Sequence, residues 1–226
     1  MRFKSRGMLL ALAVLAMSAL AVSAASAATL PEFKPVPTKK KFTSAGGAVV
    51  WTFNNGTETM TCSNSTAAGE VTGAKTLGKL VVKFTGCETS GTKAHGCPVT
   101  SAGAKEGEIV TKALSGELGT VPTNEATSGV GILLKPETEK KWATLVGNAC
   151  TEETPLTGSL AAEVPTIGKK QATNKLVISD PSNSQKIKEI KLDSGKEAYP
   201  ELVSWGTTLI VAATDEVAFE EALEVT

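Results

Sequence analysis

Recognisable motifs for acid–base or nucleophilic chemistry are few in this chain of 226 residues. His95 is its only histidine, and it lies in the glycine- and threonine-rich stretch Glu88–Gly96 between two cysteines. A nucleophile–histidine–carboxylate site would have to use this histidine, but the sequence has no G-x-S-x-G motif to supply the nucleophile. We therefore interpret His95 as a solvated loop residue and predict no catalytic residue.

Two pairs of glutamates have a spacing that suits general acid–base work. Glu106 and Glu108 would share one face of an extended strand, and Glu137 and Glu139 repeat the spacing. Glycoside hydrolysis uses two carboxyl groups about 5–10 Å apart, so a secreted polysaccharide hydrolase that uses paired glutamates is one alternative function. The side chains able to stack on a sugar are Trp51, Trp142, Tyr199 and Trp205.

Metal and cofactor sites have no recognisable signature in the sequence. The three aspartates, Asp180, Asp193 and Asp215, are far apart, whereas a calcium loop clusters its oxygen ligands. With one histidine and no C-x-x-C spacing, a zinc site is poorly supported. Neither G-x-G-x-x-G nor a P-loop motif occurs. We expect neither a metal nor a cofactor.

The four cysteines, Cys62, Cys87, Cys97 and Cys150, indicate two disulfides if the chain is exported. Chain entropy does not choose between pairings, because Cys87–Cys97 with Cys62–Cys150 is worth about 7 kcal/mol and Cys62–Cys87 with Cys97–Cys150 about the same. We favour the first pairing. Cys87 closes the apolar run Leu80–Phe84 and Cys97 opens the next segment, so the two would face each other across the base of a loop.

The first 27 residues match a secretory signal peptide. Met1–Gly7 carries three basic residues, Met8–Val22 is apolar, and small residues lead to Ala25-Ser26-Ala27. Cleavage after Ala27, or after Ala28, would place the remaining chain in a compartment where disulfides persist. A spanning helix needs about 20 apolar residues, and neither this run nor any later segment reaches that length. The sequence thus predicts a secreted or cell-surface protein without a membrane span in the mature chain.

Removal of the signal peptide changes the charge of the chain. The full sequence has 23 basic and 23 acidic residues, and three of the basic ones lie in the signal, which leaves 20 against 23, a net charge of −3. Both arginines, Arg2 and Arg6, also lie there. Arginine is the usual partner of phosphates and bases. An arginine-free, mildly acidic surface with few aromatic residues therefore argues against nucleic acid as a ligand.

Residues 28–44 are rich in proline and lysine and predict an extended tether. Residues 45–226 predict a single all-β domain, with a second lobe from residue 151 as the alternative. The first element is a hairpin in which Ala48–Phe53 and Thr57–Cys62 flank Asn54-Asn55-Gly56, and Asn-Gly is a strong turn signal. A two-residue turn there would pair Trp51 with Met60 and would place Cys62 on the buried face.

Short apolar runs bounded by glycine or proline continue along the chain and predict an all-β fold. Because long segments with helical periodicity are absent, we expect an antiparallel sandwich or barrel of short strands. A short helix competes at 186–192, and the terminal run 216–225 favours a strand. The expected strands cover residues 80–84, 108–114, 130–134, 142–146, 159–164, 175–178, 187–192, 207–212 and 216–225.

Several stretches resemble a group of uncharacterised exported proteins that occur in large paralogous sets in soil actinobacteria. The resemblance implies an exported, disulfide-bonded β protein. That group has no assigned activity, so the resemblance carries no functional residue. The matching pieces are Leu30–Phe33, Thr61-Cys62, Val82–Cys87, Leu114–Gly119, Val130–Pro136 and Thr157–Leu160.

Together these observations favour a secreted, non-enzymatic β module that binds an envelope polymer or a protein partner. The tether, the disulfide-stapled β core and the lack of a convergent catalytic set motivate this expectation. The polysaccharide hydrolase is the first alternative. The second is a protease inhibitor that presents residues 87–97, since a loop braced by Cys87–Cys97 would be pre-organised for such a contact.

Overall fold

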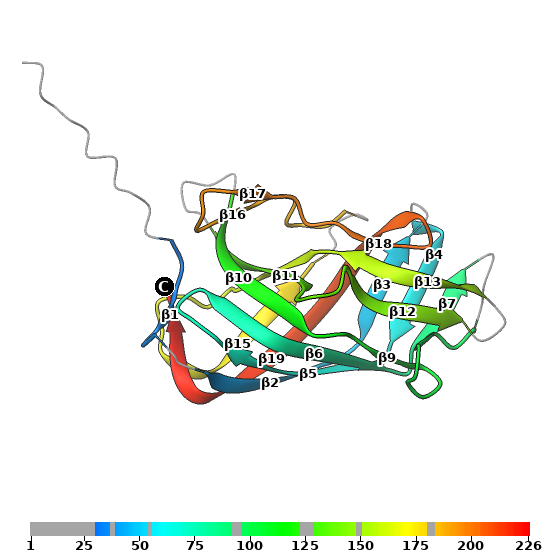
Figure 1. The fold of residues 1–226 in the computed structure, drawn as a ribbon, viewed down its shortest axis with the longest axis horizontal. Coiled ribbons are helices and arrows are strands. Elements are labelled where there is room, and N and C mark those ends of the chain that lie inside the picture. The colour runs from blue at the N-terminus through cyan, green and yellow to red at the C-terminus, as the bar shows by residue number, and fades with distance from the viewer. Residues whose placement is uncertain are drawn as a thin grey trace, which may run out of the picture.

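The computed structural model describes residues 30–36, 39–53, 56–91, 96–122, 129–147, 151–179 and 184–226. The chain is 66% strand and 1% helix, which confirms the predicted all-β class. The strands form an elongated body (Figure 1), with a closed barrel at one end and a second curved sheet at the other. Of the two predicted architectures, sandwich or barrel, the barrel is present.

Eight antiparallel strands close the barrel in the order β2-β5-β6-β10-β11-β14-β15-β19, with β19 returning to β2. Closure leaves this sheet no open edge, which removes a site for unwanted strand pairing. The strands are β2 (Lys40–Gly46), β5 (Asn64–Val71), β6 (Thr76–Thr85), β10 (Leu114–Val121), β11 (Gly129–Pro136), β14 (Leu160–Glu163), β15 (Gln171–Ile178) and β19 (Thr207–Val225).

The second sheet has the order β8-β12-β13-β18-β19-β3-β4-β7 and shares β19 with the barrel. Its other strands are β3 (Val49–Phe53), β4 (Glu58–Cys62), β7 (Glu88–Gly91), β8 (Thr100–Ser101), β12 (Lys141–Gly147), β13 (Thr151–Gly158) and β18 (Leu202–Ser204). Four short strands lie outside both orders: β1 (Phe33–Lys34) on β19, β9 (Glu108–Val110) on β6, and β16 (Ile190–Leu192) with β17 (Glu197–Ala198) beside β10.

The two sheets are joined because several chain segments run through both. β2 continues into β3, β4 into β5, β6 into β7 and β13 into β14, each across one or two residues. Two of these junctions use glycine with a left-handed backbone, Gly86 (φ 64°) and Gly158 (φ 97°), a conformation that other residues adopt only with strain. These bends turn the long strands from one sheet into the other.

The predicted hairpin is correct in register. Trp51 pairs with Met60 and Val49 with Cys62 on β3 and β4. The terminal run is also a strand, as expected, and forms the second half of β19. The run 187–192 is a strand only over Ile190–Leu192. Strands β5 and β13 were not predicted, because small and polar residues dominate them and hide their apolar phase.

The disulfide pairing that the sequence favoured is wrong. Cys62 is bonded to Cys87, with Cα atoms 3.9 Å apart. The reason is register: β4 pairs with β7, Thr61 lies opposite Glu88, and the next pair along the two strands is Cys62 and Cys87. This bridge lies where β4 passes into β5 and β6 into β7, so it staples the two sheets at their junction. Cys97 is also disulfide-bonded, and Cys150 lies outside the described residues.

Part of the predicted tether, residues 28–44, is built into the barrel. Phe33–Lys34 forms β1 on the end of β19, with Phe33 opposite Val225, and Lys40–Gly46 is β2. Phe33 is 3% exposed, and its backbone N–H donates to the carbonyl of Ala74. Along β2, Phe42 and Ser44 are less exposed than the residues between and beside them, as expected for a strand in the barrel wall. The run of lysines before Phe42 hid this alternation in the sequence.

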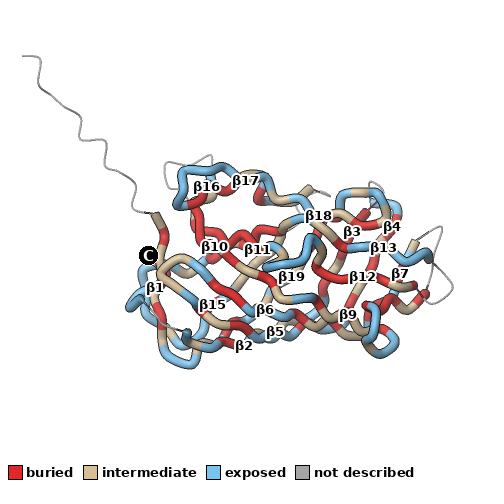
Figure 2. The backbone as a smooth tube through the Cα atoms, viewed as in Figure 1, coloured by how far each residue is buried: buried red, intermediate tan, exposed pale blue. Residues whose placement is uncertain are grey.

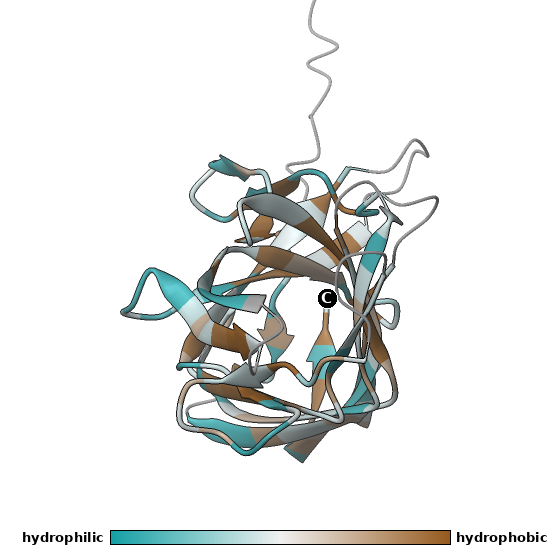
Figure 3. Cartoon of the chain, turned by 90° about the vertical axis from the view of Figure 1, so that its right-hand side faces the viewer, coloured by the Kyte–Doolittle hydropathy of each residue, from teal (hydrophilic) through white to brown (hydrophobic). Residues whose placement is uncertain are grey.

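One buried cluster fills both halves of the body, from Phe33 in the barrel to Leu145 in the second sheet. Along the barrel strands buried and exposed segments alternate (Figure 2), and most hydrophilic segments lie at the periphery in the view along the body (Figure 3). A smaller cluster around Ile187 and Ile190 packs the β16–β17 region onto the outside of β11 and β14. Among the described residues, no helix is long and apolar enough to cross a membrane.

Candidate functional site

The structure places the glutamate pairs suggested by the sequence at turns and bends rather than along the face of one strand. Glu106 lies in a turn and Glu108 begins β9, with Gly107 (φ 71°) between them, so they do not share one face of a strand. Glu108 forms an ion pair with Lys83 at 2.9 Å. Glu137 and Glu139 lie in the bend between β11 and β12. His95 lies outside the described residues.

The aromatic side chains divide into buried and accessible ones. Trp51 and Trp142 are 2% and 3% exposed and belong to the core. Trp205 is half-buried and stacks on Phe53, with ring centroids 5.5 Å apart. Tyr199 is 65% exposed, and its hydroxyl donates to Glu197, which raises the pKa of the tyrosine. Only the last two side chains are placed to meet a ligand from solvent.

The segment 87–97 is a strand pair at its base, although Cys87 and Cys97 are not bonded to each other. The Val99 N–H donates to the Cys87 carbonyl, and the Thr89 N–H donates to the Cys97 carbonyl, each at 2.9 Å. Residues 92–95, which would form the tip of an inhibitory loop, lie outside the described residues. No group of three or more histidine, cysteine or acidic side chains in the described part of the chain is arranged to hold a metal ion.

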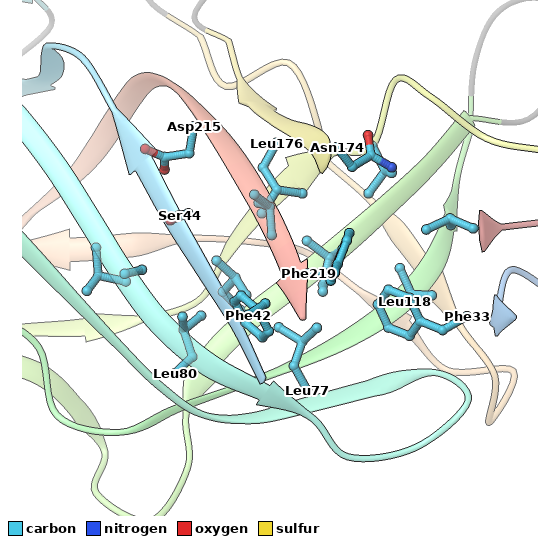
Figure 4. A pocket seen from close by; sticks show the side chains of 17 residues that line it. Phe33, Phe42, Ser44, Leu77, Leu80, Leu118, Asn174, Leu176, Asp215 and Phe219 are labelled. Carbon is cyan, nitrogen blue, oxygen red and sulfur yellow. The ribbon is translucent and has the colours of Figure 1, made fainter. Parts of the chain in front are cut away.

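The feature that does gather functional groups is a cavity of about 70 Å³ inside the barrel. Fourteen of its seventeen lining residues are apolar, and the other three are Ser44, Asn174 and Asp215 (Figure 4). The apolar lining consists of Phe33, Phe42, Ala67, Leu77, Leu80, Val82, Leu118, Ile132, Leu134, Val164, Leu176, Val217, Phe219 and Val225.

Strand register arranges one wall of the cavity in layers. Phe42 lies opposite Phe219, and the edges of their rings meet with centroids 6.3 Å apart. Two residues along β2, Ser44 lies between Val217 and Ala67. The next layer holds Asp215, Gly46 and Ser65. The wall therefore changes from aromatic to polar along the barrel, because successive inward positions on a strand are two residues apart.

Asp215 and Ser65 are joined across a glycine. The Ser65 hydroxyl donates to Oδ1 of Asp215, and Gly46 is the residue between them in the sheet. A Cβ at Gly46 would lie 1.8 Å from that Oδ1 and 2.4 Å from the serine Oγ. Glycine at this position thus leaves the space through which the hydrogen bond passes. Ser65 is 2% exposed, whereas Asp215 keeps partial exposure.

Asn174 adds a polar, uncharged side chain on the neighbouring strand β15, where it lies opposite Val217. It is 6% exposed, its Nδ2 donates to the Thr166 carbonyl at 3.0 Å, and its Oδ1 accepts from the Lys175 N–H at 2.8 Å. Its amide is thereby held by the chain, so Asn174 is a fixed wall residue.

Phe33 lies at one end of the cavity. Figure 4 places it at the far side from Asp215, with Phe42 and Phe219 between. β1 holds Phe33 there through backbone hydrogen bonds between Glu32 and Thr226 in both directions. The cavity is accordingly bounded by an aromatic end and a carboxylate end.

Sequence reasoning missed every polar residue of this cavity. The usable signal was the phase of β19: Asp215 falls on the same face as Val217 and Phe219, so a charge stands where the alternation calls for an apolar residue. Comparisons of the chain with protein-family models, with curated proteins and with solved structures found no match.

Proposed function

We propose that this chain is a non-enzymatic binding module that acts outside the cytoplasm and holds a small apolar group inside its barrel. The observation that carries the proposal is the largely apolar cavity inside the barrel, with a carboxylate at one end. Eight-stranded barrels are just wide enough either to be filled by side chains or to hold one small ligand. Export is supported by the signal-like N-terminus and by the Cys62–Cys87 bridge, since disulfides persist in oxidising compartments.

The size of the cavity sets the class of ligand. A buried water needs roughly 10–15 Å³ of such space, so 70 Å³ corresponds to roughly five to seven water-sized groups. The lining residues extend from Asp215 to Phe33 along the barrel (Figure 4). Such a space suits a short alkyl chain of about six carbons, such as the end of an acyl or amino-alkyl group.

Isothermal titration calorimetry with 1-hexanol tests the proposal. Two neighbouring alanines of β5 give a matched pair of variants: Ala67 lines the cavity, and Ala68 lies on the other face of the strand. Ala67→Leu fills the cavity and should abolish binding of hexanol. Ala68→Leu adds the same atoms outside and should leave the dissociation constant within about twofold of the wild type.

A gain-of-space variant guards against loss of binding through misfolding. Leu118 is 1% exposed and lines the cavity, so Leu118→Ala enlarges it and should admit benzene, which binds engineered apolar cavities of about 150 Å³. Equal hexanol binding by Ala67→Leu and the wild type, or exclusion of benzene by a folded Leu118→Ala, would refute a ligand site in the barrel.

A second candidate function, retention on an envelope polysaccharide, is favoured by Trp205. This residue has φ 49° in a two-residue turn with Gly206 (φ 70°), where Ser204 pairs with Thr207. A bulky residue in the left-handed region is an outlier that costs about 1–3 kcal/mol, and the turn presents the half-buried indole beside Phe53. Trp205→Ala should lose the retention on insoluble cell-wall polysaccharide that the wild type shows. Retention of Trp205→Ala equal to that of the wild type would refute this candidate.

A further inference from the structure

We infer that the ligand of the barrel carries a primary ammonium group on its alkyl chain and that Asp215 binds this group. The inference rests on the proposed function, because it names the polar end of the molecule that the cavity takes. The ligand class is then a short alkylamine or the amino-terminated end of a larger molecule, with its chain directed toward Phe33.

Asp215 is the sole charged side chain among the described residues that line the cavity. No lysine in the described part of the chain forms an ion pair with it; its one partner there is the Ser65 hydroxyl, which occupies Oδ1. The second carboxylate oxygen, Oδ2, therefore keeps its hydrogen-bonding capacity for a ligand. An ammonium group, with three N–H donors and a positive charge, complements such an acceptor.

The surroundings of Asp215 favour an organic cation over a metal ion. Metal sites for hard cations collect several oxygen ligands, whereas Asp215 lies opposite Leu176 and its next inward neighbour on β19 is Val217. The polar lining residues one layer away, Ser44 and Asn174, are uncharged. A carboxylate placed against apolar walls loses solvation, and pairing with a charged donor restores it. An alkylammonium satisfies both parts of the site, with its charge at Asp215 and its chain on the apolar walls.

The layered wall also orients the ligand. Ser44 lies one layer beyond Asp215 toward the aromatic end, and Phe42 with Phe219 forms the layer after it. An ammonium at Asp215 would thus be followed by a polar position and then by aromatic rings. Gly46 and Ser65 hold the carboxylate in this orientation, since the serine hydroxyl reaches it across the glycine.

Calorimetric titration of the purified protein with hexylamine and with 1-hexanol tests the inference, because the two probes differ only in the head group. Wild type should bind hexylamine at least tenfold more tightly than hexanol, the effect expected of one charge-assisted hydrogen bond. Asp215→Asn keeps the shape and an acceptor for Ser65 but removes the charge. It should abolish the preference while changing hexanol affinity less than threefold.

Glu216→Gln is the matched control, since Glu216 is the next residue of β19, exposed on the outer face and opposite Lys175. It should leave both affinities unchanged. Equal affinity of wild type for the two probes, or a preference that survives in Asp215→Asn, overturns the ammonium inference while hexanol binding keeps the proposed function intact. If neither probe binds, both the ammonium inference and the proposed function are overturned. If Glu216→Gln reduces the preference for hexylamine, the preference comes from general surface charge, and the role of Asp215 is overturned.

Discussion

Two adjacent glycines, Gly46 and Gly47, allow the polar layer of the cavity to be tested by stability alone. A Cβ at Gly46 would lie 1.8 Å from Oδ1 of Asp215, whereas a Cβ at Gly47 would have no atom of the described residues within 4 Å. Neither glycine has a positive φ, so alanine fits the backbone at both positions. The two substitutions therefore differ only in what the added methyl group meets.

The expected cost of Gly46→Ala follows from the hydrogen bond that it breaks. The Asp215 and Ser65 side chains can both rotate away from the methyl group, so the main loss is the bond between them, which leaves a buried hydroxyl without its partner. Losing a bond to a charged acceptor costs about 1.5–3 kcal/mol. Where the backbone conformation suits alanine, replacing glycine by alanine stabilises the folded protein by about 0.4–1 kcal/mol, because alanine lowers the conformational entropy of the unfolded chain. The free energy of unfolding should fall by about 1–2 kcal/mol in Gly46→Ala and stay equal or rise slightly in Gly47→Ala.

Urea unfolding of both variants, followed by tryptophan fluorescence, measures this difference. In a Ser65→Ala background the hydrogen bond is already absent, so Gly46→Ala should lose most of its cost, a coupling that a double-mutant cycle isolates. Equal stability of Gly46→Ala and Gly47→Ala would refute the reasoning. So would a cost for Gly46→Ala that Ser65→Ala leaves unchanged, because the destabilisation would then not depend on the Ser65–Asp215 contact.

Three further predictions concern other parts of the molecule. Replacing Cys62 and Cys87 by alanine should lower the free energy of unfolding by about 3.5 kcal/mol, the chain-entropy value for a separation of 25 residues, and a loss below about 1 kcal/mol in urea unfolding would contradict it. Glu197→Gln should lower the pKa of Tyr199, the chain's single tyrosine, in an absorbance titration, and an unchanged titration would contradict the assignment. Because the pKa of Tyr199 is raised in the folded protein, the stabilising effect of the hydrogen bond is present below the ordinary tyrosine range and is lost as the pH rises through the folded pKa. Phe33→Ala should cost about 3 kcal/mol and let the cavity take 1-octanol, and a fully stable variant would show that β1 does not close the barrel.

The sequence was informative where apolar alternation is strong and turns are explicit. The register of the β3–β4 hairpin follows from Asn55-Gly56 and from the phase of Trp51 and Met60, both of which are local. The disulfide was not predictable in this way. Its pairing depends on β4 lying beside β7, a contact between strands far apart in the sequence that no local pattern specifies.

The cavity shows the same limit at the level of function. Ser44 follows soon after a lysine run that predicts a tether. Ser65 lies in a strand of small and polar residues in which apolar and polar positions do not clearly alternate. Asp215 was considered only as a candidate calcium ligand, and its separation from the other two aspartates in the sequence argued against that role. These residues become one site because barrel closure sets β19, β2 and β5 side by side, and closure is a property of the whole chain.

The most direct test of the account is where a bound alkyl chain lies in the protein. Intermolecular nuclear Overhauser effects between 1-hexanol and the wild-type protein should connect the alkyl protons to the rings of Phe42 and Phe219 and to the methyl groups of Leu118. The same contacts should disappear in Ala67→Leu and persist in Ala68→Leu. Contacts to Trp205 instead, or no contacts at saturating hexanol, would contradict a ligand site inside the barrel.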